Sequence, residues 1–380
     1  MKKGILFSLL LAVLLVFSAC GESAEEKAAK TPQGKFVQTV ENASDVPDQS
    51  AYTTTFGVTD ITVPSSDSSA ASMGILKDIK LSMKTSTDKK AGKSESKLNV
   101  TSTNNLFPLS IDLDFLVNTK TGGAFIPLKS IIEPDASLLS YLDQATNGMW
   151  SKLNTQYPDL KNKYLSTEEL TSTLSGETLP DTAVDTKKIE AASKDLNKKA
   201  NKLLNSYFTG LEKDRFKEAK DGTISVTLTN ADLSNLMSKA AKLMDDEKVK
   251  VDFKVLLESQ GTESLTDFDT SYADMKSSLQ DGAKELKENK DIAINIKISV
   301  KPGKDNSLDA LTLKVNVADK TNADEPQSIT FTVKTKAEEF TPIDDFPTKD
   351  EIITSDELSK IMTEFYSQMY SGMDLSGSGL

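Results

Sequence analysis

Two separate parts of the chain alternate apolar and polar residues with a period of two. The alternation runs through residues 79–100 and 111–115 in the first part, and through residues 292–317 and 329–333 in the second. Turn sequences rich in lysine, glycine and asparagine, such as "TDKKAGK" and "KPGKDNS", interrupt the runs. This pattern predicts antiparallel strands that have one apolar face and one polar face.

Between these two parts, apolar residues recur at helical spacing. Residues 185–211 carry one apolar stripe, and residues 233–244 carry another that follows Asn230, a good residue for a helix N-cap. Residues 271–290 indicate a weaker helix, while residues 248–257 fit a helix and a strand equally well. Strands at both ends with helices between them predict an α+β fold, in which helices pack on the concave face of a curved, half-barrel-like antiparallel sheet.

The two strand regions share an order of elements. "KDIKLSMKTSTDKKAGKSESKLNV" and "KDIAINIKISVKPGKDNSLDALTLKVNV" both run from Lys-Asp-Ile through a strand and a lysine-glycine turn into a second strand. Chance similarity and an internal repeat both explain this order. A repeat would give one body over residues 51–380, with related sheet halves at about 75–130 and 290–335 around a helical middle.

The last helical pattern is rich in methionine and aromatic residues. Thr354 and Glu357 have the spacing of a capping box. The stripe that follows consists of Leu358, Ile361, Met362, Phe365, Tyr366, Met369, Tyr370 and Met373. A core-packing helix is the simpler interpretation. Because methionine adapts to varied apolar shapes, the alternative is an apolar ligand site formed by Met362, Phe365, Met369 and Met373.

Other aromatic residues allow the same two interpretations. Phe107, Phe115, Phe125 and Trp150 follow or lie within the first strand region. They could line a cavity, although packing in the core of the sheet is the simpler role for most of them.

The N-terminus has the three parts of an export signal. Lys2 and Lys3 precede an apolar run over residues 4–17, and small residues follow at Ser18 and Ala19. The sequence "FSAC" resembles the lipobox of a bacterial lipoprotein signal, with phenylalanine where an aliphatic residue is usual. The resemblance implies a signal peptide over residues 1–19, cleavage before Cys20, and attachment of diacylglycerol to the Cys20 sulfur.

A lipidated Cys20 would place the protein at the extracytoplasmic face of the bacterial cell membrane. Two acyl chains give stable anchoring where one chain is marginal. Residues 20–50 are mostly polar, and we expect them to form a flexible tether with a reach of roughly 30 Å. The lysine-rich, arginine-poor composition is typical of low-GC Gram-positive bacteria.

Composition excludes several function classes. The 380 residues contain no histidine and one cysteine, so no catalytic dyad with imidazole and no thiolate zinc cluster can form. The net charge of −12 argues against nucleic-acid binding. Paired carboxylates at Asp112 and Asp114, at residues 267–269 and at residues 342–347 lack the spacing of a calcium loop. We therefore expect no enzyme activity, no metal and no cofactor, although a carboxylate-based hydrolase stays an alternative.

The strand-into-helix unit "GTISVTLTNADLSNLM" and the strand pair after residue 290, together with the lipobox, resemble the LolA/LppX-like lipoproteins. The resemblance implies a hydrophobic ligand, such as a lipid or acyl chain, held between the half-barrel and its helices. The alternative is a structural or interaction lipoprotein that contacts the cell wall or another envelope protein and has no ligand cavity. The sequence leaves the oligomeric state open.

Overall fold

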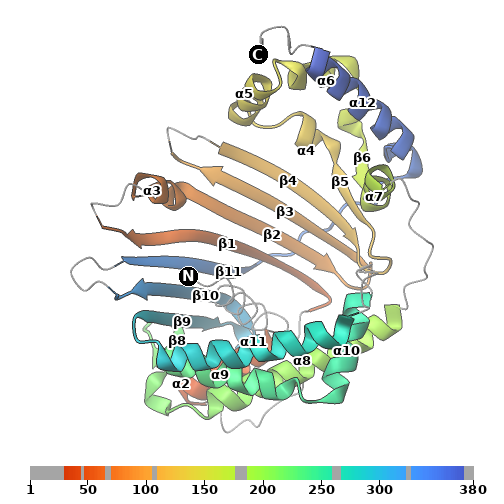
Figure 1. The fold of residues 1–380 in the computed structure, drawn as a ribbon. Coiled ribbons are helices and arrows are strands. Elements are labelled where there is room, and N and C mark those ends of the chain that lie inside the picture. The colour runs from red at the N-terminus through yellow and green to blue at the C-terminus, as the bar shows by residue number, and fades with distance from the viewer. Residues whose placement is uncertain are drawn as a thin grey trace. The chain divides into compact units, whose positions relative to one another are not determined.

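The strands form one open antiparallel sheet, which the helices flank (Figure 1). The computed structural model describes residues 30–43, 47–64, 70–104, 109–175, 186–258, 267–321 and 327–371. Within these residues the strand order is β6-β5-β4-β3-β2-β1-β11-β10-β9-β8-β7. The sheet is curved and not closed, which confirms the predicted α+β class.

The strands differ in length, and the long ones other than β1 lie in the two regions of period-two alternation. They are β1 (Gln49–Thr62), β2 (Ile79–Asp88), β3 (Lys93–Ser102), β4 (Leu109–Asn118), β5 (Ala124–Pro127), β6 (Tyr164–Ser166), β7 (Lys217–Glu218), β8 (Ile224–Leu228), β9 (Ile292–Pro302), β10 (Leu308–Asp319) and β11 (Gln327–Glu338).

The α-helices occur mainly between the two strand regions. They are α2 (Pro32–Asn42), α3 (Ala70–Asp78), α4 (Leu128–Ile132), α5 (Ala136–Ala145), α6 (Met149–Gln156), α7 (Thr167–Ser175), α8 (Thr186–Thr209), α9 (Asn230–Leu243), α10 (Glu247–Glu258), α11 (Phe268–Glu288) and α12 (Ser355–Ser371).

The chain divides into two compact units. The first unit contains residues 1–47, 56–77 and 184–337, and the second contains residues 48–55, 78–183 and 338–380. Strands β9 to β11 belong to the first unit and strands β2 to β5 to the second, so the two predicted strand regions fall in different units. The internal repeat of the two strand regions stays a prediction.

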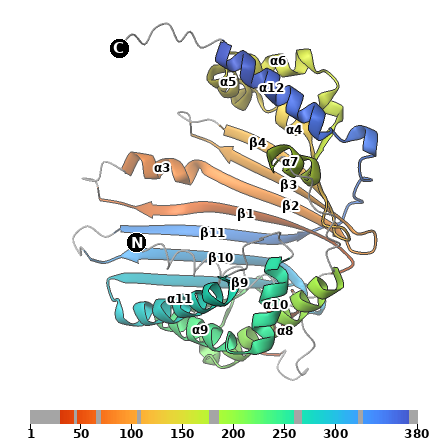
Figure 2. The same cartoon turned by 45° about the vertical axis from the view of Figure 1, so that its right-hand side comes forward.

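The core of the first unit lies on one face of its strands. Ile298 pairs with Leu313 on one side and with Val226 on the other, and all three side chains are at most 3% exposed. Helices α2, α8, α9 and α11 supply the opposing apolar residues, and α9 and α11 run side by side (Figure 2). Each fully buried side chain of this size contributes roughly 1.5–3 kcal/mol to folding.

Helix α2 corrects the expected tether. It lies within residues 20–50, and Phe36 is fully buried, with its ring 5.2 Å from those of Phe208 and Phe216. The side-chain amide of Gln33 also donates hydrogen bonds to the carbonyl oxygens that end α8, including that of Phe208 at 2.9 Å. A flexible tether up to residue 50 is therefore wrong, because these contacts hold residues 32–42 in the core.

Local details of the helices also differ from the predictions. Residues 248–257, which fitted helix and strand equally, lie in α10. Thr229, and not Asn230, is the N-cap of α9, because the Asp232 carboxylate accepts from both the backbone N–H and the hydroxyl of Thr229. The side chain of Asn230 instead bonds the backbone of β9 at Ile292 and Ile294.

The apolar face of β2, β3 and β4 is only partly covered. The register places Leu81, Val100 and Ile111 in one row and Met83, Leu98 and Leu113 in the next. Met83 is 40% exposed, and the other five are partly exposed. Neither cluster of buried residues in the described chain includes any of the six.

The only arginine of the chain holds the beginning of α9. Both terminal nitrogens of Arg215 bond the Asp232 carboxylate, at 2.8 and 2.7 Å, and the Asp232 side chain is 12% exposed. Burial alone would raise the pKa of Asp232, but the hydrogen bonds from Arg215 and Thr229 outweigh it and lower the pKa to about 2. The carboxylate therefore stabilises the fold in its ionised form.

We predict that this carboxylate gives the protein an acid-sensitive stability. The pKa of Asp232 is about 2 in the folded chain and roughly 3.9 in the unfolded chain. Its contribution of about 2 kcal/mol is present above the unfolded pKa, decreases as the pH falls from roughly 4, and is lost below the folded pKa. Urea unfolding between pH 2 and pH 7 should show that Asp232→Asn removes this part of the pH dependence.

The control is Asp214→Asn, which removes an exposed carboxylate next to Arg215 in the sequence. It should keep the pH dependence of the wild-type chain. Equal pH profiles for Asp232→Asn and wild type would contradict the assigned role of Asp232.

Candidate functional site

An apolar cavity of about 280 Å³ lies within the second unit. Its walls come from α4, α6, the segment that leads into β6, and α12. The residues that line it are almost all aliphatic or aromatic, namely Leu128, Ile131, Ile132, Trp150, Leu153, Leu160, Leu165, Ile353, Leu358, Ile361, Met362, Phe365 and Tyr366. Ligand pockets commonly measure roughly 300–1,000 Å³ and have mostly apolar walls, so this cavity is at the small end of that range.

One wall of the cavity depends on how the chain enters α12. The backbone N–H of Ile353 donates to the carbonyl oxygen of Tyr164 at 2.9 Å, which attaches this segment to the edge of β6. Ile353 is 1% exposed and packs in a small cluster with Leu128 and Leu165. This contact fixes the start of α12, so that Leu358 and Ile361 turn toward the same cluster.

Hydrogen bonds between side chains and backbone then stabilise the first turn of α12. The backbone N–H of Thr354 donates to the Glu357 carboxylate at 3.1 Å, and the N–H of Glu357 donates to the Thr354 hydroxyl at 3.3 Å. This reciprocal pair confirms the predicted capping box. Glu169 of α7 adds a further acceptor for the N–H of Ser355, at 2.7 Å.

Trp150 supplies the one indole group of the chain to the cavity wall. Its ring meets that of Phe365 edge to face, with centroids 6.0 Å apart and planes at 89°. The indole N–H is buried, and no residue that the structure describes accepts its hydrogen. An unpaired buried donor costs roughly 1–3 kcal/mol.

A polar contact joins the helices on two sides of the cavity. The Tyr157 hydroxyl, at the end of α6, donates to the Glu364 carboxylate of α12. This hydrogen bond is the main cause of a raised pKa at Tyr157, with burial and the negative charge of Glu364 adding to it. The phenol therefore stays protonated and keeps its donor role at neutral pH.

The structure brings together only part of the predicted ligand site. Met362 and Phe365 line the cavity. Met369 belongs to α12, but its side chain is outside what the structure describes, and Met373 and Cys20 lie outside the described residues. The ligand-binding role of these residues and the lipidation of Cys20 stay predictions.

The other candidate aromatic residues separate from one another. Phe125 on β5 contacts Phe346, with centroids 5.9 Å apart, and Phe115 lies half-buried on β4. Phe107 is outside the described residues. Trp150 lies on α6 and lines the cavity, which is one of the two roles that the sequence left open for it.

Sequence reasoning missed the aliphatic half of the cavity. Residues 128–132 and 160–165 form a very short helix, a single 3₁₀ turn and a three-residue strand. Elements of this length have too few residues to establish a period. The one available signal was "MWSKL", in which Met149, Trp150 and Leu153 have helical spacing.

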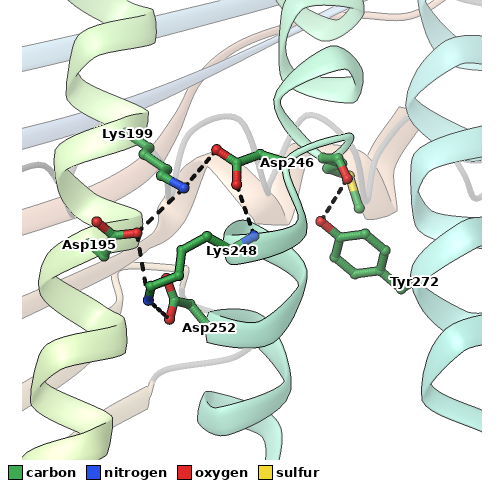
Figure 3. Close-up of polar contacts among 7 residues, drawn as sticks. Asp195, Lys199, Asp246, Lys248, Asp252 and Tyr272 are labelled. Atoms are coloured by element: carbon green, nitrogen blue, oxygen red, sulfur yellow. Dashed lines mark hydrogen bonds and ion pairs between the residues drawn. The ribbon is translucent and has the colours of Figure 1, made fainter.

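A polar cluster in the first unit joins lysine and aspartate side chains of α8 and α10 (Figure 3). Lys199 of α8 contacts Asp246 at 2.7 Å and Asp195 at 3.5 Å, and Lys248 of α10 pairs with the buried Asp252. Burial alone would lower the pKa of Lys199, but Asp246 and Asp195 outweigh it and raise the pKa. The cluster joins α8 to the start of α10, which is a structural role.

Tyr272 adds an internal hydrogen bond beside this cluster. Its hydroxyl donates to the carbonyl oxygen of Met244 at 3.1 Å, which joins α11 to the end of α9 (Figure 3). Burial raises the pKa of Tyr272 to about 12, with the negative charge of Asp246 as a further cause.

The carboxylate pairs proposed from the sequence have ordinary surface partners. Asp112 accepts from Asn99 at 2.7 Å on the exposed side of the sheet, Asp269 pairs with Lys250 at 2.8 Å, and Asp345 pairs with Lys93 at 2.6 Å. Among the described residues, no group of three or more acidic or cysteine side chains is placed to hold a metal ion.

Comparison with known proteins identifies no relative of this chain. No protein-family model, no curated protein and no solved structure matches it. Within the described part of the chain, no helix has the length and apolar character needed to cross a membrane.

We predict that Ile353 controls the stability of the cavity region. Ile353→Ala removes a side chain that is 1% exposed and should lower the free energy of unfolding by roughly 2–5 kcal/mol. Because Trp150 is the only tryptophan, its fluorescence reports unfolding of the second unit during a urea titration.

The matched control is Met83→Ala, which truncates an apolar side chain of the same unit that is 40% exposed. It should shift stability by no more than about 0.5 kcal/mol. An Ile353→Ala transition that coincides with that of wild type would show that Ile353 does not hold the wall of the cavity.

Proposed function

We propose that this protein is a non-enzymatic, lipid-anchored component of the bacterial cell envelope whose body binds a hydrophobic ligand, a lipid or acyl chain. The observation that carries the proposal is the apolar cavity of the second unit. The sequence predicts Met362 and Phe365 as ligand-binding residues, and both line it. The LolA/LppX-like resemblance agrees with this function but stays a prediction.

The chemistry of the cavity wall supports an apolar ligand. No lysine, arginine, aspartate or glutamate is among the residues that line it. Burial of apolar ligand surface there would gain roughly 25 cal/mol per Å². Methionine at position 362 can adjust its rotamers to chains of different shape.

The half-exposed face of β2, β3 and β4 supports a second candidate function. Its six apolar side chains share one side of the sheet, and Met83 is the most exposed of them. Apolar surface of this kind often marks a contact with another protein or with lipid. An interaction lipoprotein that binds through this face is therefore the alternative.

Quenching of Trp150 fluorescence tests ligand binding directly. A methyl ester with a brominated acyl chain should quench the emission on contact, because Trp150 lines the cavity and is the only tryptophan. The unbrominated ester should bind without comparable quenching. Absence of binding by both esters would contradict the proposed function.

Two matched variants distinguish the cavity from the sheet face. Met362→Gln places an amide in the cavity wall and should weaken ester binding by roughly tenfold, because burial of an unpaired amide costs about 1–3 kcal/mol. Met83→Gln makes the same change at a side chain that is 40% exposed, and it should leave binding unchanged. If Met83→Gln weakened ester binding and Met362→Gln did not, the binding site would lie on the sheet face and not in the cavity.

The anchor has its own test. In the native host, the wild-type protein should sediment with membranes and incorporate radiolabelled palmitate, while Cys20→Ala should do neither. Ser23→Ala, three residues further on, is the control and should behave as wild type. Membrane association of Cys20→Ala equal to that of wild type would contradict lipidation at Cys20.

A further inference from the structure

The polar face of the first unit's sheet gathers lysines without acids. The apolar residues of β8 to β10 pack against the helices, so the alternate side chains of these strands point to the opposite face. Among the paired positions that the structure describes on this face, none is aspartate or glutamate. The face carries exposed lysines, which together we call the lysine face, namely Lys217, Lys297, Lys301, Lys314, Lys334 and Lys336.

The charges at the centre of the lysine face are uncompensated. Lys297 and Lys314 are directly opposite each other in the antiparallel pair of β9 and β10, and like charges in such positions destabilise a sheet. Lys334 lies diagonally next to Lys314 on β11. None of these three lysines has an ion pair with a described residue, whereas Lys301, at the end of the face, pairs with Asp309 at 3.2 Å. An anion from outside the chain would remove the repulsion.

The polar face of β2, β3 and β4 in the second unit provides a comparison. There Lys84 and Lys97 are also directly opposite each other. Lys97, however, is paired with Asp114 on its other side and contacts Glu95 at 3.4 Å. The lack of acids is therefore a property of the lysine face and not of every polar face in the chain.

Two common roles of surface lysines do not explain the arrangement. Lysines protect the free edges of sheets, but β9 and β10 each lie between two other strands. Charged side chains also keep a protein soluble, but the net charge of this chain is −12, so that each lysine decreases its magnitude. A binding surface for an anionic partner accounts for the pattern.

The geometry of the lysine face fits a flat partner. One row of paired positions runs from Lys217 across five strands to Lys334, a width of about 19 Å at roughly 4.8 Å per strand. Side chains on a sheet stand nearly perpendicular to it, so the lysines do not converge on a single small anion. A linear polymer follows one row at a time, whereas a plane of phosphate headgroups meets all the rows together.

The proposed anchor would bring such a plane within reach. Pro32, where α2 begins, is 12 positions after Cys20. Even when fully extended, this length of chain spans no more than about 43 Å. Lipidation of Cys20 would therefore keep the first unit near the bilayer, where every lysine adds to the attraction of an anionic lipid surface.

We infer that the lysine face binds the surface of a bilayer that contains anionic phospholipid, with Lys297, Lys314 and Lys334 at the centre of the contact. This inference rests on the proposed anchor and adds a second, electrostatic attachment to it. Acyl chains and a basic patch are attachments that reinforce each other at membranes. The sheet of the first unit then faces the bilayer, and the helices that cover its apolar face point away.

Sedimentation with vesicles tests the inference on the unlipidated full chain. One set of vesicles is phosphatidylcholine alone, and the other has equal parts of phosphatidylcholine and phosphatidylglycerol. Wild type should bind the anionic vesicles more tightly, and added salt should reduce the difference. The triple variant Lys297→Gln, Lys314→Gln and Lys334→Gln should lose roughly tenfold or more of this preference.

The matched control is the triple variant Lys80→Gln, Lys84→Gln and Lys97→Gln on the polar face of the second unit. It has the same net charge as the first variant and should keep the preference of wild type. Equal losses in the two triple variants would overturn the inference, as would a wild type that binds both sets of vesicles equally.

A soluble probe separates the bilayer from a phosphate polymer. Wild type should bind inorganic polyphosphate more weakly, per phosphate, than the anionic vesicles. Equal or tighter binding of polyphosphate would overturn the assignment to a bilayer. Because the chain in these measurements is unlipidated, a negative result leaves the anchor at Cys20 and the ligand cavity standing. Failure of palmitate labelling would instead remove the anchor, whatever the vesicles show.

Discussion

Strand alternation is the constraint on which the structure depends. Successive side chains of a strand point to opposite faces, so a sheet built from these sequences has one apolar face that must be covered. In the first unit, α2, α8, α9 and α11 cover it, and residues such as Ile298 and Leu313 are almost completely buried. In the second unit, the apolar face of β2, β3 and β4 stays partly exposed, and the small buried cluster forms elsewhere, around Ile353.

Because of this difference, the candidate apolar binding surfaces of the protein are in the second unit. A fully packed core has no room for a ligand, because protein interiors are as dense as organic crystals. The second unit has short helices around a cavity, and their contacts leave space between α4, α6 and α12. Its partly exposed sheet face and its cavity are the two apolar surfaces on which the proposed functions rest.

The sequence predicted those helices and strands whose apolar residues recur with a regular period. Strands β2 to β4 and β9 to β11 and helices α8, α9 and α11 have several apolar residues in period, so their type and approximate position could be predicted. Strand β1 was not predicted. Helix α2 was missed because it has only three large apolar residues, Phe36, Val37 and Val40, and its stability comes from contacts with Phe208 and Phe216. Tertiary packing of this kind has no local signal.

The candidate site was predicted in part for the same reason. The α12 stripe is periodic, so Met362 and Phe365 could be selected, whereas Trp150 and the aliphatic wall come from short elements. Their proximity to α12 depends on the bond from Ile353 to Tyr164 and on the packing of Leu165. No sequence pattern within residues 128–165, or within the segment that leads into α12, indicates that the two segments are in contact.

The contact between Tyr157 and Glu364 has a consequence for the order in which the protein is assembled. The two residues are 207 positions apart, so α6 leaves the ribosome long before the helix that it must meet. Until α12 arrives, Leu128 and Leu165 have no cover from it, and apolar surface left open in this way promotes aggregation or chaperone binding. Closing such a long loop is also entropically slow. The cavity is therefore among the last features to form, and a chain interrupted before residue 353 would have the residues of the first unit but not those that complete the cavity.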